Sequence, residues 1–337
     1  MTTRQRGLGE FEIIRRFFAP LAKGAPGAFG LTDDAAALDL PPGQSLVVTS
    51  DALVAGVHFL ADDTAADVAA KALRVNLSDL ASMGARPMAY TLALALTRET
   101  GVEWLEPFAR ALAADQELFG IHLIGGDTVA TPGPLTLSIC AFGCVAQGAA
   151  LRRSGAQVGD AVFVTGTIGD AALGLIALRT GLAGVTTADQ DALAARYRRP
   201  IPRTACGLRL VGLAKAAVDV SDGLVADLGH ICETSGTAAV IETARVPLSA
   251  AARAALAVGA GSWRDILSGG DDYELLFAAP PDSEPTLAGI SKSLDLPITR
   301  IGRIVERTAT DDPDRLVGVT DLDGRRMMLE GSGYRHF

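Results

Sequence analysis

Short runs of β-branched and aliphatic residues alternate with longer segments of helical periodicity along the whole chain, and this alternation restricts the possible folds most strongly. In the first half, strands are predicted at 45–51, 88–96, 123–124 and 135–145, and helices at 10–18, 63–83 and 103–119. The pattern restarts after residue 151, with strands at 161–165 and 217–220 and helices at 170–178 and 203–216. Strands that alternate with helices indicate an α/β or α+β fold, because bundles and sandwiches lack this alternation.

The chain has 337 residues, which is long for one hydrophobic core, so we expect two globular domains. The boundary is predicted near Gly148, which gives domains at 1–148 and 149–337. A net charge of -9 argues against nucleic acid as a partner, because clustered Lys and Arg bind phosphate backbones. The longest apolar stretch, around 87–96, is too short to span a bilayer, so a cytoplasmic protein without membrane contact is expected. The four cysteines form no CxxC pair, which argues against a zinc ribbon or a disulfide framework.

Many aspartates follow apolar strands or lie among small residues, instead of sharing helix faces with Lys. They are Asp33, Asp34, Asp51, Asp79, Asp127, Asp219, Asp222, Asp271 and Asp272. Buried carboxylates without partners are costly, and few cationic side chains stand beside these in the sequence. Divalent cations resolve this conflict. Carboxylates together with the hydroxyls of Thr49, Ser50 and Ser221 are hard oxygen ligands, which suit Mg²⁺. For a single aspartate, a helix cap or a turn is the simpler interpretation.

Several Mg²⁺ ions suit a reaction that brings a polyphosphate donor and a phosphorylated acceptor together, because the metal ions offset the repulsion between them. Gly125 and Gly126 give backbone room for a phosphate beside Asp127, and glycines at 166 and 169 open a helix whose N-terminus suits an anion. Tight turns are the alternative interpretation of both glycine pairs. The chain has no GxxxxGK[ST] or HRD motif, which excludes the common nucleotide-binding folds.

No general base is evident in the sequence, and this favours a phosphate acceptor over an alcohol. A phosphate monoester is largely ionised at pH 7, with a second pKa of ~6, so no base is needed to activate it. Among the four histidines, His58 follows Asp51 closely enough to be a candidate contact for a substrate anion.

Eight motifs in this order resemble bacterial thiamine-monophosphate kinases, and they cover nearly the whole chain. They are GLTDDAA at 30–36, TSD at 49–51 with GVHF at 56–59, NLSDLASMGA at 76–85, LIGGDT at 123–128, RSGA at 153–156 with GD at 159–160, DVSDGL at 219–224, SGGDDYEL at 268–275 and GYRHF at 333–337. The resemblance implies the two-domain fold of the aminoimidazole ribonucleotide synthetase-like superfamily. In that fold the N-terminal domain binds ATP and Mg²⁺ and pairs its sheet with a twin in a homodimer, and the C-terminal domain closes the active-site cleft.

The same resemblance implies direct transfer of the γ-phosphoryl group of ATP to thiamine monophosphate, with several Mg²⁺ ions, and it assigns residues to roles. The implied metal ligands are Asp34, Thr49, Ser50, Asp51, Asp79, Asp127, Asp219 and Asp222. The implied ATP contacts are Gly125, Gly126, Asp127, Arg153 and Ser221. The implied substrate contacts are His58, Asp271 and Tyr334. The residues expected to carry catalysis are Asp79, Asp127, Asp222 and Arg153.

The sequence departs from the family pattern at two places. Thr32 stands where the family usually has a second glycine before the two aspartates, and Gly331–Ser332 stand where it often has an aromatic residue over the thiamine. Two alternatives stay open: another ATP-using enzyme of the superfamily, such as an aminoimidazole ribonucleotide synthetase, and a non-catalytic dimer that binds metal or nucleotide. Selenophosphate synthetase is disfavoured because no cysteine precedes Cys140.

Overall fold

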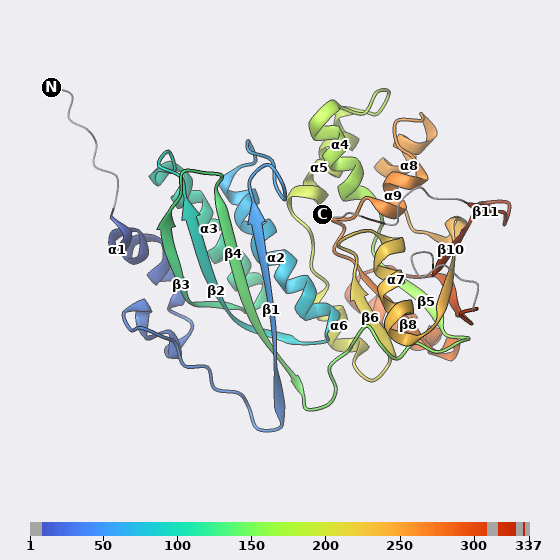
Figure 1. The fold of residues 1–337 in the computed structure, drawn as a ribbon, viewed down its shortest axis with the longest axis horizontal. Coiled ribbons are helices and arrows are strands. Elements are labelled where there is room, and N and C mark those ends of the chain that lie inside the picture. The colour runs from blue at the N-terminus through green and yellow to red at the C-terminus, as the bar shows by residue number, and fades with distance from the viewer. Residues whose placement is uncertain (1–8, 309–315, 328–332, 334–337) are drawn as a thin grey trace. The chain divides into compact units, whose positions relative to one another are not determined.

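The computed structural model describes residues 9–308, 316–327 and 333. The chain forms two compact units, of which the first comprises Met1–Leu80 with Arg86–Gln147 and the second comprises Ala81–Ala85 with Gly148–Phe337 (Figure 1). None of the helices in the described ranges combines the length and the apolar character needed to cross a membrane.

The first unit contains a four-stranded sheet in the order β1-β4-β2-β3, in which only β2 and β3 run parallel. Its strands are β1 Gln44–Val54, β2 Arg86–Leu96, β3 His122–Ala130 and β4 Thr136–Ala146. Its long helices are α2 Ala65–Ser82 and α3 Val102–Phe119. The N-terminal segment forms α1 Glu10–Ile13 and the short helices η1 Ile14–Phe18, η2 Ala19–Ala22 and η3 Pro26–Leu31.

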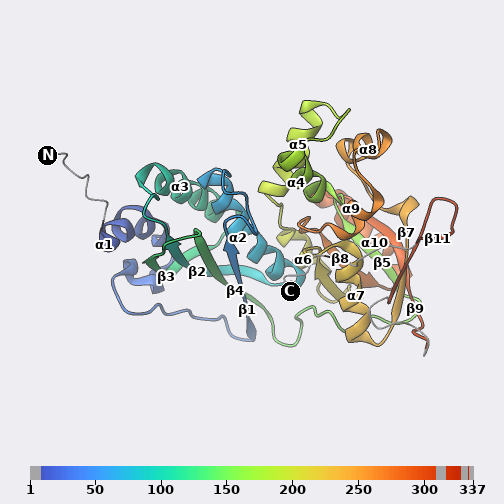
Figure 2. The ribbon, with the colours of Figure 1, turned by 45° about the horizontal axis from the view of Figure 1, so that its top comes forward.

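The two faces of this sheet differ. Helices α2 and α3 both lie on one face (Figure 2). Residues of β1 alternate accordingly, because successive side chains of a strand point to opposite faces. Val47 and Leu53 are buried, whereas Leu46 and Val48 are 42% and 53% exposed. The exposed face of β1 therefore consists of Leu46, Val48, Ser50 and Ala52.

The second unit contains a seven-stranded mixed sheet in the order β11-β10-β7-β9-β5-β8-β6. Its strands are β5 Ala161–Thr165, β6 Ala216–Asp219, β7 Ala238–Glu242, β8 Leu275–Ala279, β9 Ile298–Val305, β10 Val317–Thr320 and β11 Arg326–Met327. Its helices are α4 Asp170–Thr180, α5 Thr187–Arg198, α6 Thr204–Leu210, α7 Leu224–Ser235, α8 Ala250–Ala257, α9 Trp263–Ser268 and α10 Glu284–Leu294, with η4 Thr243–Arg245 and η5 Pro281–Ser283.

The central strands of the second unit are buried on both faces. On β5, Val162 and Val164 belong to a core shared with α7, whereas Ala161 and Phe163 belong to a second core shared with α6 and α10. All five residues of β8 are likewise buried. Strands covered on both sides are rigid supports, and β6 and β8 end or begin beside the acidic loops described below.

The predicted α/β class is confirmed, but several predicted boundaries are wrong. The strand predicted at 123–124 extends over His122–Ala130, and the strand predicted at 45–51 extends to Val54. Consequently Asp51 and Asp127 lie within strands and do not follow them. Both strands are edges of the sheet, where one side is unpaired and polar residues are tolerated. The helix predicted at 203–216 ends at Leu210, followed by Gly212 with φ of 78°.

Candidate functional site

In the first unit, β1 and α2 bring Thr49, Asp51 and Asp79 together. The Thr49 hydroxyl donates a hydrogen bond to Oδ2 of Asp79. Burial, and then the negative charge of Asp79, raise the pKa of Asp51 to about 6. The two carboxylates therefore disfavour each other's ionised form, and a divalent cation between them would remove that cost. All the donor atoms of this group are hard oxygens, as Mg²⁺ prefers.

Ser50 lies apart from this group. It belongs to the exposed face of β1 and pairs in register with Cys140 of β4, whereas Thr49 and Asp51 point to the opposite face by strand alternation. The structure therefore does not bring the Ser50 side chain to Asp51 and Asp79. Thr49, Ser50 and Asp51 were predicted as one ligand set from their consecutive positions. Successive residues of a strand, however, lie on opposite faces of the sheet.

A second group of the first unit surrounds a pocket of about 300 Å³. The loop that carries Asp34 and the Gly125–Asp127 segment of β3 both line this pocket. This placement is compatible with the predicted metal and nucleotide contacts of these residues. Apolar residues of the N-terminal helices form the rest of the lining, among them Phe11, Ile14 and Phe18. Asp33, next to Asp34, also lines the pocket. The pocket therefore combines an acidic and an apolar part.

The loop before Asp34 forms its turn without a glycine at position 32. Phe29, Gly30 and Leu31 have φ values of 49°, 67° and 60°, so the left-handed conformation falls on these three residues. Thr32 has φ of -111°, which any residue adopts, and its hydroxyl donates to the carbonyl of Phe29. Two non-glycine residues in the left-handed region cost of order 1–3 kcal/mol each, and such strain clusters at functional sites.

Gly125 and Gly126 both line the pocket, but only one of them is required by close packing. Gly126 has φ of 155°, and a Cβ there would collide with the carbonyl oxygen of Leu92 on β2. At Gly125 a Cβ would meet only Cγ2 of Thr91, at 3.7 Å. The close approach of β2 therefore requires Gly126, so room for a phosphate is not needed to explain that glycine.

His58 follows β1 in a tight turn. The backbone N–H of Val54 donates to Nδ1 of His58 at 3.0 Å. Because Nδ1 accepts this hydrogen bond, the neutral ring carries its proton on Nε2. His58 can therefore donate a hydrogen bond to an anion, as its predicted substrate role requires.

In the second unit, β6 ends at the buried Asp219, and the loop that follows it is held by Asp227 of α7. Oδ2 of Asp227 accepts hydrogen bonds from the backbone N–H groups of Ser221, Asp222 and Gly223 at 3.0, 3.1 and 3.1 Å. Burial, and then the charges of Asp219 and Asp222, raise the pKa of Asp227 well above its usual range. One buried carboxylate oxygen thus fixes three consecutive residues of the loop.

Asp227 also belongs to a possible metal-binding set. In the described ranges, Asp222, Asp227 and His230 offer ligand atoms that all lie within 4.8 Å of one another. Neither Asp227 nor His230 was singled out from the sequence as a candidate ligand. The available signal was their spacing, because residues three apart on a helix share a face.

A second loop of this unit packs against the first. Asp271 donates its backbone N–H to the carbonyl of Ser221 at 2.8 Å, and Tyr273 donates to that of Val220 at 2.8 Å. Both donors are non-glycine residues with positive φ, of 64° and 52°. A Cβ at Gly270 would collide with the carbonyl of Ser221, so only glycine permits this approach. The structure therefore brings Asp271 next to the Ser221–Asp222 loop, as the predicted roles imply.

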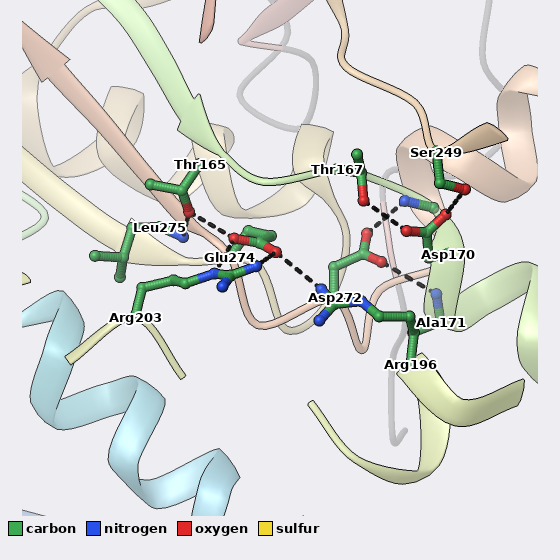
Figure 3. A network of polar contacts seen from close by, with 11 residues as sticks. Thr165, Thr167, Asp170, Ala171, Arg196, Arg203, Ser249, Asp272, Glu274 and Leu275 are labelled. Carbon is green, nitrogen blue, oxygen red and sulfur yellow. Dashed lines mark hydrogen bonds and ion pairs between the residues drawn. The ribbon is translucent and has the colours of Figure 1, made fainter. Parts of the chain in front are cut away.

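The N-terminus of α4 does not serve as the predicted anion site. The buried carboxylate of Asp272 occupies it, accepting hydrogen bonds from the N–H groups of Gly169 and Ala171 at 2.7 and 3.2 Å (Figure 3). Burial raises the pKa of Asp272 to about 8, against the lowering effect of those hydrogen bonds. The expectation was wrong because the sequence does not show that the side chain of a residue 103 positions away occupies this helix N-terminus.

Glu274, two residues further, is fully buried and binds two arginines (Figure 3). Arg203 donates through Nε and a terminal nitrogen, and Arg196 of α5 donates to Oε1 at 2.8 Å. The Thr165 hydroxyl donates to Oε2 at 2.7 Å and accepts from the N–H of Leu275 at 2.8 Å. Sequence reasoning missed this group entirely.

The backbone of Arg153 lies at the far end of α7 from the Ser221–Gly223 loop. The carbonyl of Arg153 accepts from the Ser235 hydroxyl at 3.4 Å, at the C-terminal end of α7. The Ser221–Gly223 loop lies at the other end of that helix, whose 12 residues span about 18 Å. Tyr334 lies outside the described residues, as do Gly331 and Ser332.

Comparison with known proteins assigns one family domain to each of the two units. The model of the AIR synthase related protein, N-terminal domain, matches residues 32–145, and that of the AIR synthase related protein, C-terminal domain, matches 157–311. The chain is 43% identical to thiamine-monophosphate kinase of Escherichia coli strain K12 over 331 residues, which cover 98% of each chain.

Solved structures give the same result. The crystal structure of thiamine-monophosphate kinase from Stenotrophomonas maltophilia K279a has a TM-score of 0.79 and 43% identity, covering 92% of this chain and 97% of that one. A structure of AaThiL complexed with AMPPCP and TMP has a TM-score of 0.75 and 30% identity, with the same two coverages.

Proposed function

This chain belongs to the thiamine-monophosphate kinase family, within the AIR synthase related proteins, and on this basis we propose that it phosphorylates thiamine monophosphate to thiamine diphosphate with ATP. A relative with the same fold is known in complex with AMPPCP and TMP, which supports ATP as the phosphoryl donor and thiamine monophosphate as the acceptor. The family name, the fold and the acidic loops agree on one reaction class.

The observation that carries the proposal is the Thr49–Asp51–Asp79 group. Two carboxylates share a half-buried position, and burial with mutual repulsion raises the pKa of Asp51 to about 6. Such a group favours a divalent cation and has no comparable use in an ordinary core. The proposed metal ligands are therefore Asp51 and Asp79 with Thr49, Asp34 and Asp127 in the first unit and Asp219 and Asp222 in the second.

When bound, Mg²⁺ would offset the charge of the phosphates and stabilise the transferring group. The chain's own residues would bind and orient the two substrates. Nε2–H of His58 would donate to the acceptor phosphate, and Asp271 would contact the thiamine. Gly125, Gly126 and Ser221 would lie along the nucleotide, with Arg153 as a cationic contact. No residue needs to remove a proton, because the acceptor oxygen is already ionised at neutral pH.

Purified protein incubated with ATP, Mg²⁺ and thiamine monophosphate should form thiamine diphosphate and ADP in equal amounts, measured by chromatography. Thiamine and adenosine monophosphate serve as control acceptors, and EDTA as the control for metal. Binding of ATP without product in a single-turnover experiment would reject the kinase and favour a non-catalytic nucleotide-binding protein.

The proposal includes a homodimer formed through the first unit. The exposed face of β1 presents Leu46 and Val48, both large and apolar, as a self-complementary interface would require. Sedimentation velocity should show a dimer at micromolar concentration. Val48→Arg should shift it to monomer, whereas Val258→Arg, at an equally exposed valine of the second unit, should not.

A further inference from the structure

We infer that Glu274, held by Arg196 and Arg203, is a positioning residue that sets the Asp271–Tyr273 turn for the acceptor substrate. This rests on the proposed function, because it concerns how thiamine monophosphate is held. The four residues 271–274 alternate in exposure. Asp271 and Tyr273 are half-buried, while Asp272 and Glu274 are 2% and 0% exposed.

The turn is strained where it reaches the site. Asp271 and Tyr273 are both left-handed, and non-glycine residues in that region persist only where the surroundings hold them. The surroundings here are the alternate residues. Asp272 is tied to the start of α4, and Glu274 is tied to Arg196, Arg203 and Thr165 (Figure 3). Each strained residue therefore stands directly beside a buried carboxylate anchor.

The anchor at Glu274 is directional. Arg203 binds the carboxylate through two nitrogens, which fixes its plane as well as its position. The Thr165 hydroxyl links the same carboxylate to the N–H of Leu275, where β8 begins. The carbonyl of Glu274 accepts from the N–H of Val220 at 2.8 Å. The ion pairs thus define where the turn leaves the rigid sheet and how it meets the Ser221–Asp222 loop.

Stability alone is a poor explanation for this group. Replacing a buried ion pair by apolar residues of similar volume is often neutral or stabilising, so a buried carboxylate with two arginines gains little over a hydrophobic contact. The arginine pair, however, orients the carboxylate in a way that apolar packing does not. The geometry accordingly assigns the group to placement of Asp271.

The test separates placement from stability with a single and a double variant. Arg203→Met leaves the Glu274 carboxylate buried without its bidentate partner, and Arg203→Met with Glu274→Gln removes that unpaired charge. The single variant should lower both the unfolding midpoint and the affinity for thiamine monophosphate, the latter by ~10-fold or more, since small misplacements near a site have large effects. The double variant should recover the midpoint but not the affinity.

Affinity is measured by calorimetry with thiamine monophosphate in the presence of Mg²⁺ and the ATP analogue AMPPCP, and separately for AMPPCP alone. AMPPCP affinity should change by less than ~3-fold, because Asp227 holds the Ser221–Gly223 loop independently of the turn. Lys215→Met is the matched control. Lys215 pairs with the buried Asp160 at 2.9 Å in the same unit, beside the end of β6 opposite Asp219. It should lose stability without losing affinity for thiamine monophosphate.

Recovery of affinity together with stability in the double variant would overturn the proposal, as would an equal loss in the Lys215→Met control. If Arg203→Met does not fold, Arg203→Lys takes its place under the same criterion, because it keeps the charge and loses the two-nitrogen geometry. A wild-type protein that makes no thiamine diphosphate rejects the proposed function. An active wild type whose Arg203 variants bind thiamine monophosphate normally rejects only the positioning role.

Discussion

Asp227 offers a direct measurement of what one buried carboxylate contributes to the acidic loop of the second unit. Its Oδ2 accepts three backbone N–H groups, from Ser221, Asp222 and Gly223. In Asp227→Ala all three donors lose their acceptor. A buried donor without a partner costs about 1–3 kcal/mol, but Ser221 and Asp222 are half-buried and reach water, so only Gly223 bears the full cost.

The expected loss for Asp227→Ala is therefore about 2–4 kcal/mol of unfolding free energy. Asp227→Asn separates the hydrogen bonds from the charge. The amide oxygen still accepts the three N–H groups, and the repulsion from Asp219 and Asp222 that raises the pKa of Asp227 disappears. We expect Asp227→Asn to stay within ~1 kcal/mol of the wild type.

Urea denaturation at pH 7, followed by circular dichroism, measures both values. Wild-type stability of Asp227→Ala would refute the anchoring role, and equal losses in both variants would refute the division between acceptor and charge. The dependence of turnover on Mg²⁺ adds a second reading. If Asp227 binds a cation with Asp222 and His230, Asp227→Asn should require more Mg²⁺ despite its normal stability.

Three further predictions follow from particular residues. The pKa of Asp272 is about 8 in the folded protein against 3.8 ordinarily, so between these pH values the folded state keeps a proton that the unfolded state releases, and the free energy of unfolding should fall by up to ~1.4 kcal/mol per pH unit. Urea denaturation at pH 5, 6 and 7 should show a smaller fall in Asp272→Asn than in the wild type. Identical slopes would mean that Asp272 is ionised throughout. Gly126→Ala should lose at least ~2 kcal/mol of unfolding free energy because its Cβ meets the carbonyl of Leu92, whereas Gly125→Ala should lose less than ~1 kcal/mol. Thermal unfolding measures both losses, and equal losses would contradict the steric explanation for Gly126. Asp79→Asn should lower kcat by ~10²-fold or more in the thiamine diphosphate assay, as expected for lost charge stabilisation, and wild-type rates at ordinary Mg²⁺ would remove Asp79 from the site.

Much of the fold and part of the candidate site could be predicted from local pattern. The α/β class followed from alternating strand and helix periodicities, and the family followed from short acidic motifs in a fixed order; the comparisons confirm both. The structure also joins Asp51 with Asp79 and Asp271 with the Ser221–Asp222 loop. These residues were predictable because carboxylates in apolar surroundings stand out without any knowledge of their neighbours.

The sequence by itself determined which residue types carry the chemistry, because motifs and periodicity are properties of neighbours along the chain. Only the tertiary structure decided their roles. It placed Ser50 on the face of β1 opposite Asp51 and bound the Asp272 side chain to the start of α4. It also joined Glu274 to arginines 78 and 71 positions away. Such contacts depend on the packing of distant segments, and a carboxylate that caps a helix is indistinguishable in sequence from one that awaits a metal.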